Sequence, residues 1–198
     1  MKTRSKIIFA LLLCAALGIG GALSLRLRNG VRVRAPEANI PPEHVVFYRQ
    51  DDPAWASDRL GNSKYKMKRS GCLVTCIASA ISAEGDAVAP DTLNALFSEN
   101  SVYDDQGNMQ WSALAAIDGY HAEVYDEASA AAIDECLAGG HHPIVRVRMG
   151  GIGNTHYVLI AGAEAGEYIC MDPLEDRPTT LSRYWDRIYA VRCVWRET

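Results

Sequence analysis

The sequence predicts an α+β fold in which N-terminal helices pack on a C-terminal antiparallel sheet. Two observations carry this prediction. Helix-forming patterns dominate the chain as far as Gly139-Gly140, and the segments after this point are rich in β-branched and aromatic residues that partly alternate with polar ones. Helices that precede strands are typical of the α+β class. With 198 residues, of which 48% are hydrophobic, the chain is long enough for one domain with a sizeable core and an extension.

Residues 1–35 form the predicted extension. They carry seven basic residues and no acidic one, and an unbroken apolar run from Ile7 to Leu25 lies between the basic flanks. As a helix this run is about 28 Å long, which is close to the thickness of one bilayer core. Two interpretations stay open. The run is either an uncleaved anchor that holds an exported domain at the membrane, or a signal peptide that is cut after the small residues at 20–22 and releases a secreted protein.

Residues 36–43 (PEANIPPE) are predicted to be a linker, because three prolines and two glutamates suit neither a helix nor a central strand. The folded domain is then residues 44–198. Residues 36–198 hold 13 basic and 24 acidic residues, so their net charge is −11. This charge disfavours nucleic acid as a partner, because no basic stripe is present to replace the counterions of the phosphates.

The domain is expected to begin with a short strand at 44–50, which a polar loop follows. Helices are predicted at 72–82, 92–99, 110–118 and 128–138, the second capped by Asp91 and the last ended by the double glycine. Strands are predicted at 121–125, 143–148, 156–163, 167–171 and 187–195. The short turn EAGE (164–167) predicts that strands 156–163 and 167–171 form a hairpin.

Five of the six cysteines lie in the domain, and the sixth, Cys14, lies in the apolar run. If one of the five is kept free to react, the other four are enough for two disulfides. Cys170 and Cys193 lie on strands that we expect to be neighbours. This pair is therefore the predicted disulfide.

Cys72 is the candidate nucleophile because of its position. It follows Gly71 at the start of a predicted helix, where unpaired N–H groups and the helix dipole favour a thiolate. Cys76 lies one turn further along the same face among small residues, an environment that suits packing. Taken alone, this stretch is equally compatible with an inert thiol at position 72.

A nucleophilic cysteine needs a base, and the base needs an orienting group. His156 differs from the other four histidines because it follows a glycine-rich loop (GGIGNT) and opens an apolar strand. Asp172 follows the next predicted strand, in the sequence MDP. The predicted hairpin brings the end of that strand beside the start of the first, so we expect Asp172 to orient His156.

Together these segments resemble the stand-alone relatives of the bacteriocin-processing, double-glycine-leader cysteine peptidases, a papain-like group. The matching segments are FYRQDDPAWASDRLG (47–61), SGCLVTCIASAIS (70–82), PIVRVR (143–148) and NTHYVLIAGAEAGEYICMDP (154–173). The resemblance spans residues 44–195. It implies a papain-like fold with Cys72 as nucleophile, His156 as base and Asp172 as orienting group, and it implies no metal or cofactor. It also makes Gln50 the candidate for the polar side chain of the oxyanion hole, since Lys66 occupies the position six residues before the cysteine.

The expected function is hydrolysis of peptide bonds in a peptide or protein substrate, in a domain held at the membrane through the N-terminal helix. The double-glycine substrate does not carry over, because the chain lacks the glycine-rich phosphate loop of an ATP-driven exporter. One alternative is an inactive peptide-binding module of the same fold, which the unusual Leu73-Val74 after the cysteine favours. A redox or metal protein that uses Cys72 and Cys76 is the other alternative, but their spacing does not match a Cys-x-x-Cys motif.

Three aromatic residues are candidates for the wall of a substrate cleft. These are Trp55, Trp111 and Tyr120. A place in the core or at its rim is the ordinary interpretation for each of them.

Overall fold

The structure is a computed structural model that describes residues 2–42, 45–85 and 87–197, without the side chains of residues 2–10, 15, 16 and 19. The chain divides into two compact units, Met1–Gly30 and Val31–Thr198. The two units are described separately below.

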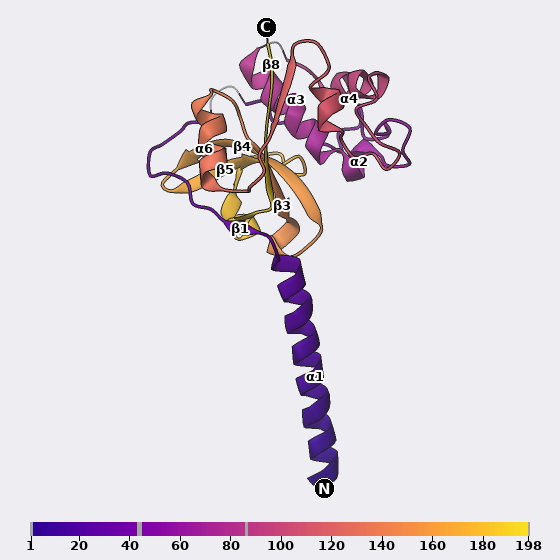
Figure 1. Cartoon of the computed structure of the whole chain (residues 1–198), viewed down its shortest axis with the longest axis vertical. Helices are drawn as coiled ribbons and strands as arrows, with labels where there is room; N and C mark the ends of the chain where they lie inside the picture. Colours follow the sequence, from indigo (N-terminus) through magenta and orange to yellow (C-terminus); the bar gives the residue numbers. More distant parts are fainter. Residues whose placement is uncertain (1, 43–44, 86, 198) are drawn as a thin grey trace. The chain divides into compact units, whose positions relative to one another are not determined.

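The first unit consists of helix α1 (Lys2–Leu27), which is the long helix of Figure 1. Several of its described leucines are exposed, among them Leu11, Leu17 and Leu25. Within the part of the chain that the structure describes, no helix is both long enough and apolar enough to cross a membrane. The structure does not describe the side chains of part of the run that was predicted as an anchor or signal segment, namely those of residues 7–10, 15, 16 and 19.

The second unit is a mixed α+β domain with a six-stranded antiparallel sheet, in agreement with the predicted fold class. Its helices are α2 (Met67–Ser70), α3 (Cys72–Glu84), α4 (Pro90–Glu99), α5 (Trp111–Leu114) and α6 (Ala130–Ala138), with 3-10 turns η1 (Met149–Gly151) and η2 (Leu181–Tyr184). Its strands are β1 (Val31–Arg32), β2 (Tyr120–Val124), β3 (Ile144–Arg148), β4 (Thr155–Glu164), β5 (Glu167–Met171), β6 (Thr179–Thr180), β7 (Arg187–Ile188) and β8 (Ala190–Arg196). The sheet order is β2-β8-β3-β4-β5-β6, and β1 pairs separately with β7.

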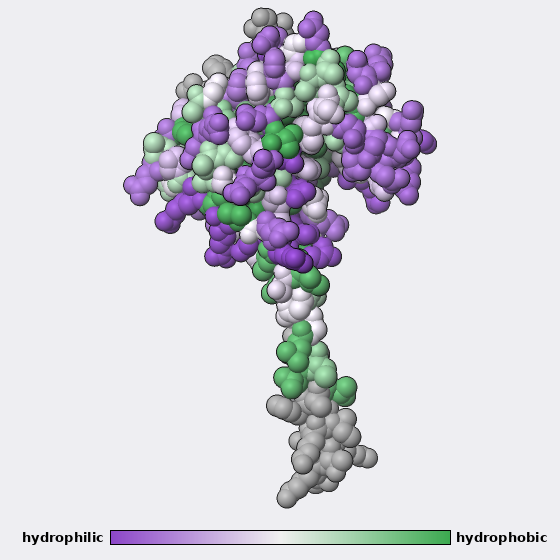
Figure 2. Space-filling model, viewed as in Figure 1, coloured by the Kyte–Doolittle hydropathy of each residue, from purple (hydrophilic) through white to green (hydrophobic). Residues whose placement is uncertain are grey.

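A hydrophobic core lies on each face of this sheet. Successive residues of a strand point to opposite faces. Ile144 therefore packs in one core with Ile77 of α3, whereas Val145 packs in the other with Ile133 of α6. Figure 1 shows α3 and α6 on opposite sides of the strands, and Figure 2 shows that hydrophilic side chains cover most of the face of this domain in view.

Most of the predicted elements are present. The predicted helices 72–82, 92–99 and 128–138 correspond to α3, α4 and α6, and the predicted strands 121–125, 143–148, 156–163 and 167–171 correspond to β2, β3, β4 and β5. The predicted hairpin is confirmed, since β4 and β5 pair antiparallel through the turn at 165–166. The predicted helix 110–118 is limited to the single turn of α5, and the predicted strand 187–195 is divided at Tyr189 into β7 and β8.

Two local predictions fail, and the structure shows the reason for the second. Residues 45–49 form no strand, and His44, the predicted first residue of the domain, lies outside the described residues. Helix α4 has Ala89 as its N-cap and Pro90 as its first residue, so Asp91 is not the cap and instead accepts a hydrogen bond from the Thr92 N–H at 2.8 Å. Proline suits this position because its missing N–H would have had no partner there.

Residues 31–42 belong to the domain, in contrast to the predicted extension and linker. Val33 and Ala35 are buried, and β1 pairs with β7. Ile40 forms a two-way backbone bridge with Ala163 of β4, with N···O distances of 2.7 and 2.8 Å. A side chain at Gly162 would lie 2.2 Å from the Ile40 carbonyl oxygen, so the missing Cβ is what lets this segment lie close to the sheet.

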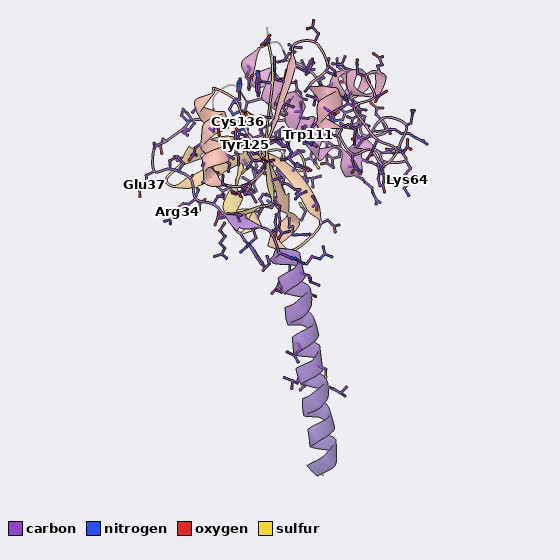
Figure 3. All side chains as sticks on the ribbon, in the orientation of Figure 1. Arg34, Glu37, Lys64, Trp111, Tyr125 and Cys136 are labelled. Atoms are coloured by element: carbon purple, nitrogen blue, oxygen red, sulfur yellow. A yellow bond between two sulfur atoms is a disulfide. The ribbon has the colours of Figure 1, made fainter. Side chains whose placement is uncertain are left out.

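The disulfide prediction was wrong. Cys193 of β8 bonds to Cys136 of α6, at an S–S distance of 2.01 Å and a Cα–Cα distance of 5.9 Å (Figure 3 labels Cys136). Cys170 of β5 is free and buried. Strands β3 and β4 lie between β5 and β8, so β5 and β8 are three strand spacings of about 4.8 Å apart. The sum of these spacings exceeds the reach of a disulfide.

Candidate active site

Cys72 is the first residue of α3, as predicted, and a break between two helices places it there. Helix α2 ends at Ser70, and Gly71 joins it directly to α3. A Cβ on Gly71 would lie 2.7 Å from the Met67 carbonyl oxygen, closer than a side chain tolerates. Gly71 has a negative φ of −81°, which other residues also adopt, so its role here is to allow close packing. The Cys72 side chain is partly exposed and lines a cavity.

The structure brings His156 and Asp172 together as the sequence predicts. The His156 Nε2 lies 2.6 Å from Asp172 Oδ1, and both side chains are buried. Asp172 follows the last residue of β5, and its Oδ1 also accepts a hydrogen bond from the Leu174 N–H at 2.9 Å. The Tyr184 hydroxyl donates to the other carboxylate oxygen. Asp172 is thus held by three donors and cannot turn away from the imidazole.

The imidazole of His156 lies between two groups that favour its protonated form. Burial lowers its pKa, but hydrogen bonds to Asp172 and to the Cys72 side chain outweigh burial and raise the pKa from 6.5 to about 9. Asp172 engages Nε2 of the ring, so Nδ1 is the nitrogen that is left for a second partner. Burial also raises the pKa of Asp172, but the bonds from His156, Tyr184 and Leu174 more than compensate and lower it.

Gln50 lies at the same site, next to the backbone that leads into Cys72. Its side chain is buried, and its Nε2 donates to the Lys68 carbonyl oxygen at 3.0 Å. Its own N–H donates to the carbonyl of Pro173, the residue after Asp172, at 2.9 Å. In a continuous helix Lys68 would be the acceptor for the Cys72 N–H. Because α2 ends at Ser70 and α3 begins at Cys72, the Cys72 N–H lies in the first turn of α3, where the N–H groups have no acceptor within their own helix.

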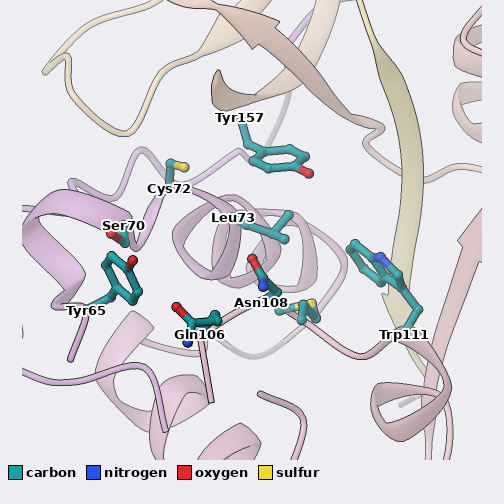
Figure 4. Close-up of a pocket in the computed structure, with 10 residues that line it drawn as sticks. Tyr65, Ser70, Cys72, Leu73, Gln106, Asn108, Trp111 and Tyr157 are labelled. Atoms are coloured by element: carbon teal, nitrogen blue, oxygen red, sulfur yellow. The ribbon is translucent and has the colours of Figure 1, made fainter. Parts of the chain in front are cut away.

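A cavity of about 360 Å³ opens beside the thiol. Figure 4 shows Cys72 and Tyr157 on one wall, with Tyr65 and Gln106 across from them and Trp111 at one end. Of the three aromatic residues suggested for a cleft wall, only Trp111 lines it; Trp55 and Tyr120 pack in the core.

The other free thiols of the domain have different surroundings. Cys76 is fully buried, its thiol donates to the Tyr157 carbonyl at 3.5 Å, and burial raises its pKa well above 9.0. Cys170 is also fully buried, and burial raises its pKa. Because the thiolate is the reactive form, neither thiol is suited to act as a nucleophile.

Two residues of the site are not marked by any sequence pattern. Tyr184, which holds Asp172, lies twelve positions after it in a segment without a motif. Tyr157 directly follows the predicted base, but it lines the cavity only because helix residues pack opposite it in the folded protein, and the sequence alone does not show this packing. Among the residues that the structure describes, no group of three or more His, Cys, Asp or Glu is placed to hold a metal ion.

Comparisons of the chain with models of protein families, with curated proteins and with solved structures find no match.

Proposed function

We propose that this protein is a cysteine peptidase with a papain-like fold, in which Cys72, His156 and Asp172 form the catalytic triad. The observation that carries the proposal is the buried pair of His156 Nε2 and Asp172 Oδ1, 2.6 Å apart, together with the effect of the Cys72 side chain, which raises the pKa of the same imidazole. Cys72 comes from α3, His156 from β4 and Asp172 from the residue after β5, and the Cys72 end of this set lines an open cavity. Nucleophilic catalysis by a thiol requires this order of nucleophile, base and orienting group.

The mechanism follows from the positions of the atoms. The Cys72 sulfur attacks the substrate carbonyl carbon as a thiolate, and the carbonyl π electrons move onto the oxygen. When the tetrahedral intermediate collapses, the C–N bond breaks and His156 gives its proton to the leaving amine. A water molecule then loses a proton to His156 and attacks the thioester, which releases the acid and restores the thiol. Asp172 keeps the ring oriented and stabilises its protonated form throughout.

Two donors are available for the negative oxygen of the intermediate. One is the Cys72 N–H, and the other is the second N–H of the Gln50 amide, whose first N–H is bonded to the Lys68 carbonyl. Loss of one such donor typically lowers the rate by about 10²–10³-fold. Gln50→Ala removes one donor and also frees the Lys68 carbonyl to accept from Cys72, so we expect a loss at the upper end of this range.

The direct test is the rate at which iodoacetamide alkylates each thiol of the full-length protein. Cys72 should react rapidly in the wild type and at least tenfold more slowly in His156→Gln, because the thiolate loses its imidazolium partner. Cys76→Ala is the matched control, since it removes the neighbouring thiol of the same helix and should leave this rate unchanged. Peptides that the wild type cleaves, and that Cys72→Ala does not, would then be identified by mass spectrometry.

The competing function is a peptide-binding module that has the fold without the chemistry. Slow alkylation of Cys72, unaffected by His156→Gln, together with peptide binding but no cleavage, would support that module and contradict the peptidase. Rapid alkylation that depends on His156, with cleavage that Cys72→Ala abolishes, would support the peptidase.

We further propose that the N-terminal segment directs the domain out of the cytoplasm, as an anchor or as a cleaved signal. The support is the apolar run between basic flanks in residues 1–35. Fractionation of cells and N-terminal sequencing distinguish the two cases. An intact N-terminus in the membrane fraction would indicate an anchor, a soluble product that starts near Leu23 would indicate a signal peptide, and an intact cytoplasmic protein would contradict both.

A further inference from the structure

Two arginines lie on the sheet next to residues that line the cavity, and no carboxylate of the described residues pairs with either of them. Arg146 of β3 pairs in register with Tyr157 of β4, and Arg192 of β8 pairs with Ile144. Because directly paired residues point to the same face, and so do residues two apart in a strand, both arginines share a face with Tyr157. Both are partly buried, and among the described residues neither forms an ion pair.

The polar contacts of the two guanidinium groups are few. Arg146 Nη2 donates to the Tyr189 carbonyl at 3.0 Å, and Arg192 Nη1 donates to the Val191 carbonyl at 2.6 Å. The Nε of Arg192 is buried and has no hydrogen-bond partner among the described residues. A guanidinium carries five N–H donors, so several donors of each arginine are left for a ligand.

The two arginines are connected to the cavity through its aromatic walls. Tyr157 lines the cavity next to Cys72 and is the register partner of Arg146. Burial raises the pKa of Tyr157, whereas the charges of Arg146 and Arg192 lower it, so both guanidinium groups act on this ring. The guanidinium carbon of Arg192 lies 5.4 Å from the centre of the Trp111 ring, which forms another part of the wall. In Figure 4 the Tyr157 hydroxyl is directed away from Cys72, toward the end of the cavity where Trp111 lies.

The local charge is opposite to the charge of the domain. Residues 36–198 carry 24 acidic residues against 13 basic ones, yet none of the described carboxylates lies within ion-pair distance of Arg146 or Arg192. Burial lowers the pKa of Arg192, and the neighbouring Arg146 lowers it further. Keeping two partly buried like charges together is unfavourable unless an anion joins them.

We propose that this end of the cavity binds a carboxylate of the peptide substrate, which Arg146 and Arg192 hold while the scissile bond lies at Cys72. The carboxylate belongs either to an Asp or Glu side chain or to the free C-terminus of the peptide. Guanidinium groups recognise carboxylates by paired, charge-assisted hydrogen bonds, which gives both affinity and orientation. This inference rests on the proposed function, because it assigns the substrate class of that same site.

The first experiment defines the preference and its source. Two randomised peptide libraries, one with free and one with amidated C-termini, are incubated with the full-length protein. Enrichment of Asp or Glu at a fixed distance from the cleaved bond in both libraries would identify the side chain as the source of the carboxylate. Cleavage restricted to the free-acid library would identify the C-terminus. Equal cleavage without either preference would overturn the inference.

The second experiment assigns the preference to the two arginines. For the preferred acidic peptide, Arg146→Met and Arg192→Met should each lower kcat/KM by about 10- to 100-fold, mainly through KM, because a charged hydrogen-bond pair is lost. Cleavage of the matching uncharged peptide should fall by a clearly smaller factor in both variants, so the ratio of the two rates reports on recognition of the carboxylate. Arg192→Lys keeps the charge and should retain part of the preference. If Arg192→Met fails to fold, Arg192→Lys still tests the role of this residue.

Lys64→Met is the control, since it removes an exposed cation that lies over Tyr65 on the opposite wall. An equal loss in Lys64→Met would indicate a diffuse charge effect and overturn the inference.

Binding to the Cys72→Ala variant separates this inference from the peptidase proposal. Fluorescence anisotropy of the acidic peptide and of its uncharged counterpart measures recognition without chemistry. Binding that depends on Arg146 and Arg192, with no cleavage by the wild type, would contradict the peptidase and support the carboxylate site. Cleavage without a carboxylate preference would support the peptidase and contradict the site, and the absence of both would contradict both.

Discussion

The protonated state of His156 should depend strongly on Asp172, and Asp172→Asn tests this. The pKa of His156 is about 9, compared with an ordinary value of 6.5. The difference corresponds to about 3 kcal/mol of net interaction in favour of the protonated ring. Asp172 and Cys72 are the two groups that supply it, against the opposing effect of burial. If they contribute equally, loss of the Asp172 charge lowers the pKa by at least about 1 pH unit.

The consequence for activity and stability has a definite sign. Hydrolysis needs a protonated His156 to release the amine, so its rate should fall as the pH rises through about 9, whereas alkylation of the Cys72 thiolate should not fall. Because folding raises the pKa of His156, this interaction stabilises the folded protein fully below pH 6.5 and is lost as the pH rises through about 9. In Asp172→Asn the alkaline loss should begin at lower pH, and hydrolysis should fall by up to about 10⁴-fold.

Two measurements check this prediction. The ring carbon resonances of the histidines, followed by NMR against pH, give the pKa of His156, which is assigned by its absence in His156→Gln. The pH profile of hydrolysis gives the same value from the reaction. Asp176→Asn is the control, because Asp176 is an exposed carboxylate in the segment that follows Asp172. A His156 pKa that is the same in Asp172→Asn as in the wild type would refute the reasoning.

Three further predictions concern the thiols and the helix junction. Cys72→Ala should abolish hydrolysis. Cys76→Ala removes a fully buried thiol, so it should lower the free energy of unfolding by about 1 kcal/mol and leave hydrolysis intact. The opposite pattern in peptide assays would identify Cys76 as the nucleophile. Gly71→Ala should destabilise the domain by about 1–3 kcal/mol and slow alkylation of Cys72, because the new Cβ would lie 2.7 Å from a backbone oxygen of the preceding turn. A crystal structure of the variant in which the start of α3 has not moved would contradict this prediction. Replacement of both Cys136 and Cys193 by Ala should lower the free energy of unfolding by about 4 kcal/mol, since the disulfide closes a loop between residues 57 positions apart and so restricts the unfolded chain. Chemical denaturation that shows no such loss would contradict this prediction.

The sequence predicts those parts of the site that depend on local geometry. The contact of His156 with Asp172 follows from a hairpin with a short turn, because pairing of β4 with β5 fixes the ends of both strands relative to each other. The position of Cys72 follows from the start of one helix. Both features depend on residues that are close along the chain, and sequence patterns describe such neighbours well.

The parts that the sequence did not predict depend on the order of strands and on contacts between distant segments. Cys170 and Cys193 could be assigned to strands, but the placement of β3 and β4 between them is a property of the whole sheet. In the same way, Ile40 lies against β4 only because the backbone at Gly162 allows a close approach. No local pattern marks either arrangement.

Two cysteines one helical turn apart in α3 thus have opposite properties because of the elements around them. Cys76 packs against β4, where its thiol donates a hydrogen bond to the Tyr157 carbonyl, and burial raises its pKa so that the thiol stays protonated. Cys72 begins the helix and lines the cavity, and its N–H belongs to the first turn, which has no acceptor within its own helix. The break between α2 and α3 causes this difference. If the two helices were continuous, the Lys68 carbonyl would accept from the Cys72 N–H, and the cavity would lose a donor although both cysteines were unchanged. The chemical character of the site therefore depends on where the helix begins as much as on which residues it contains.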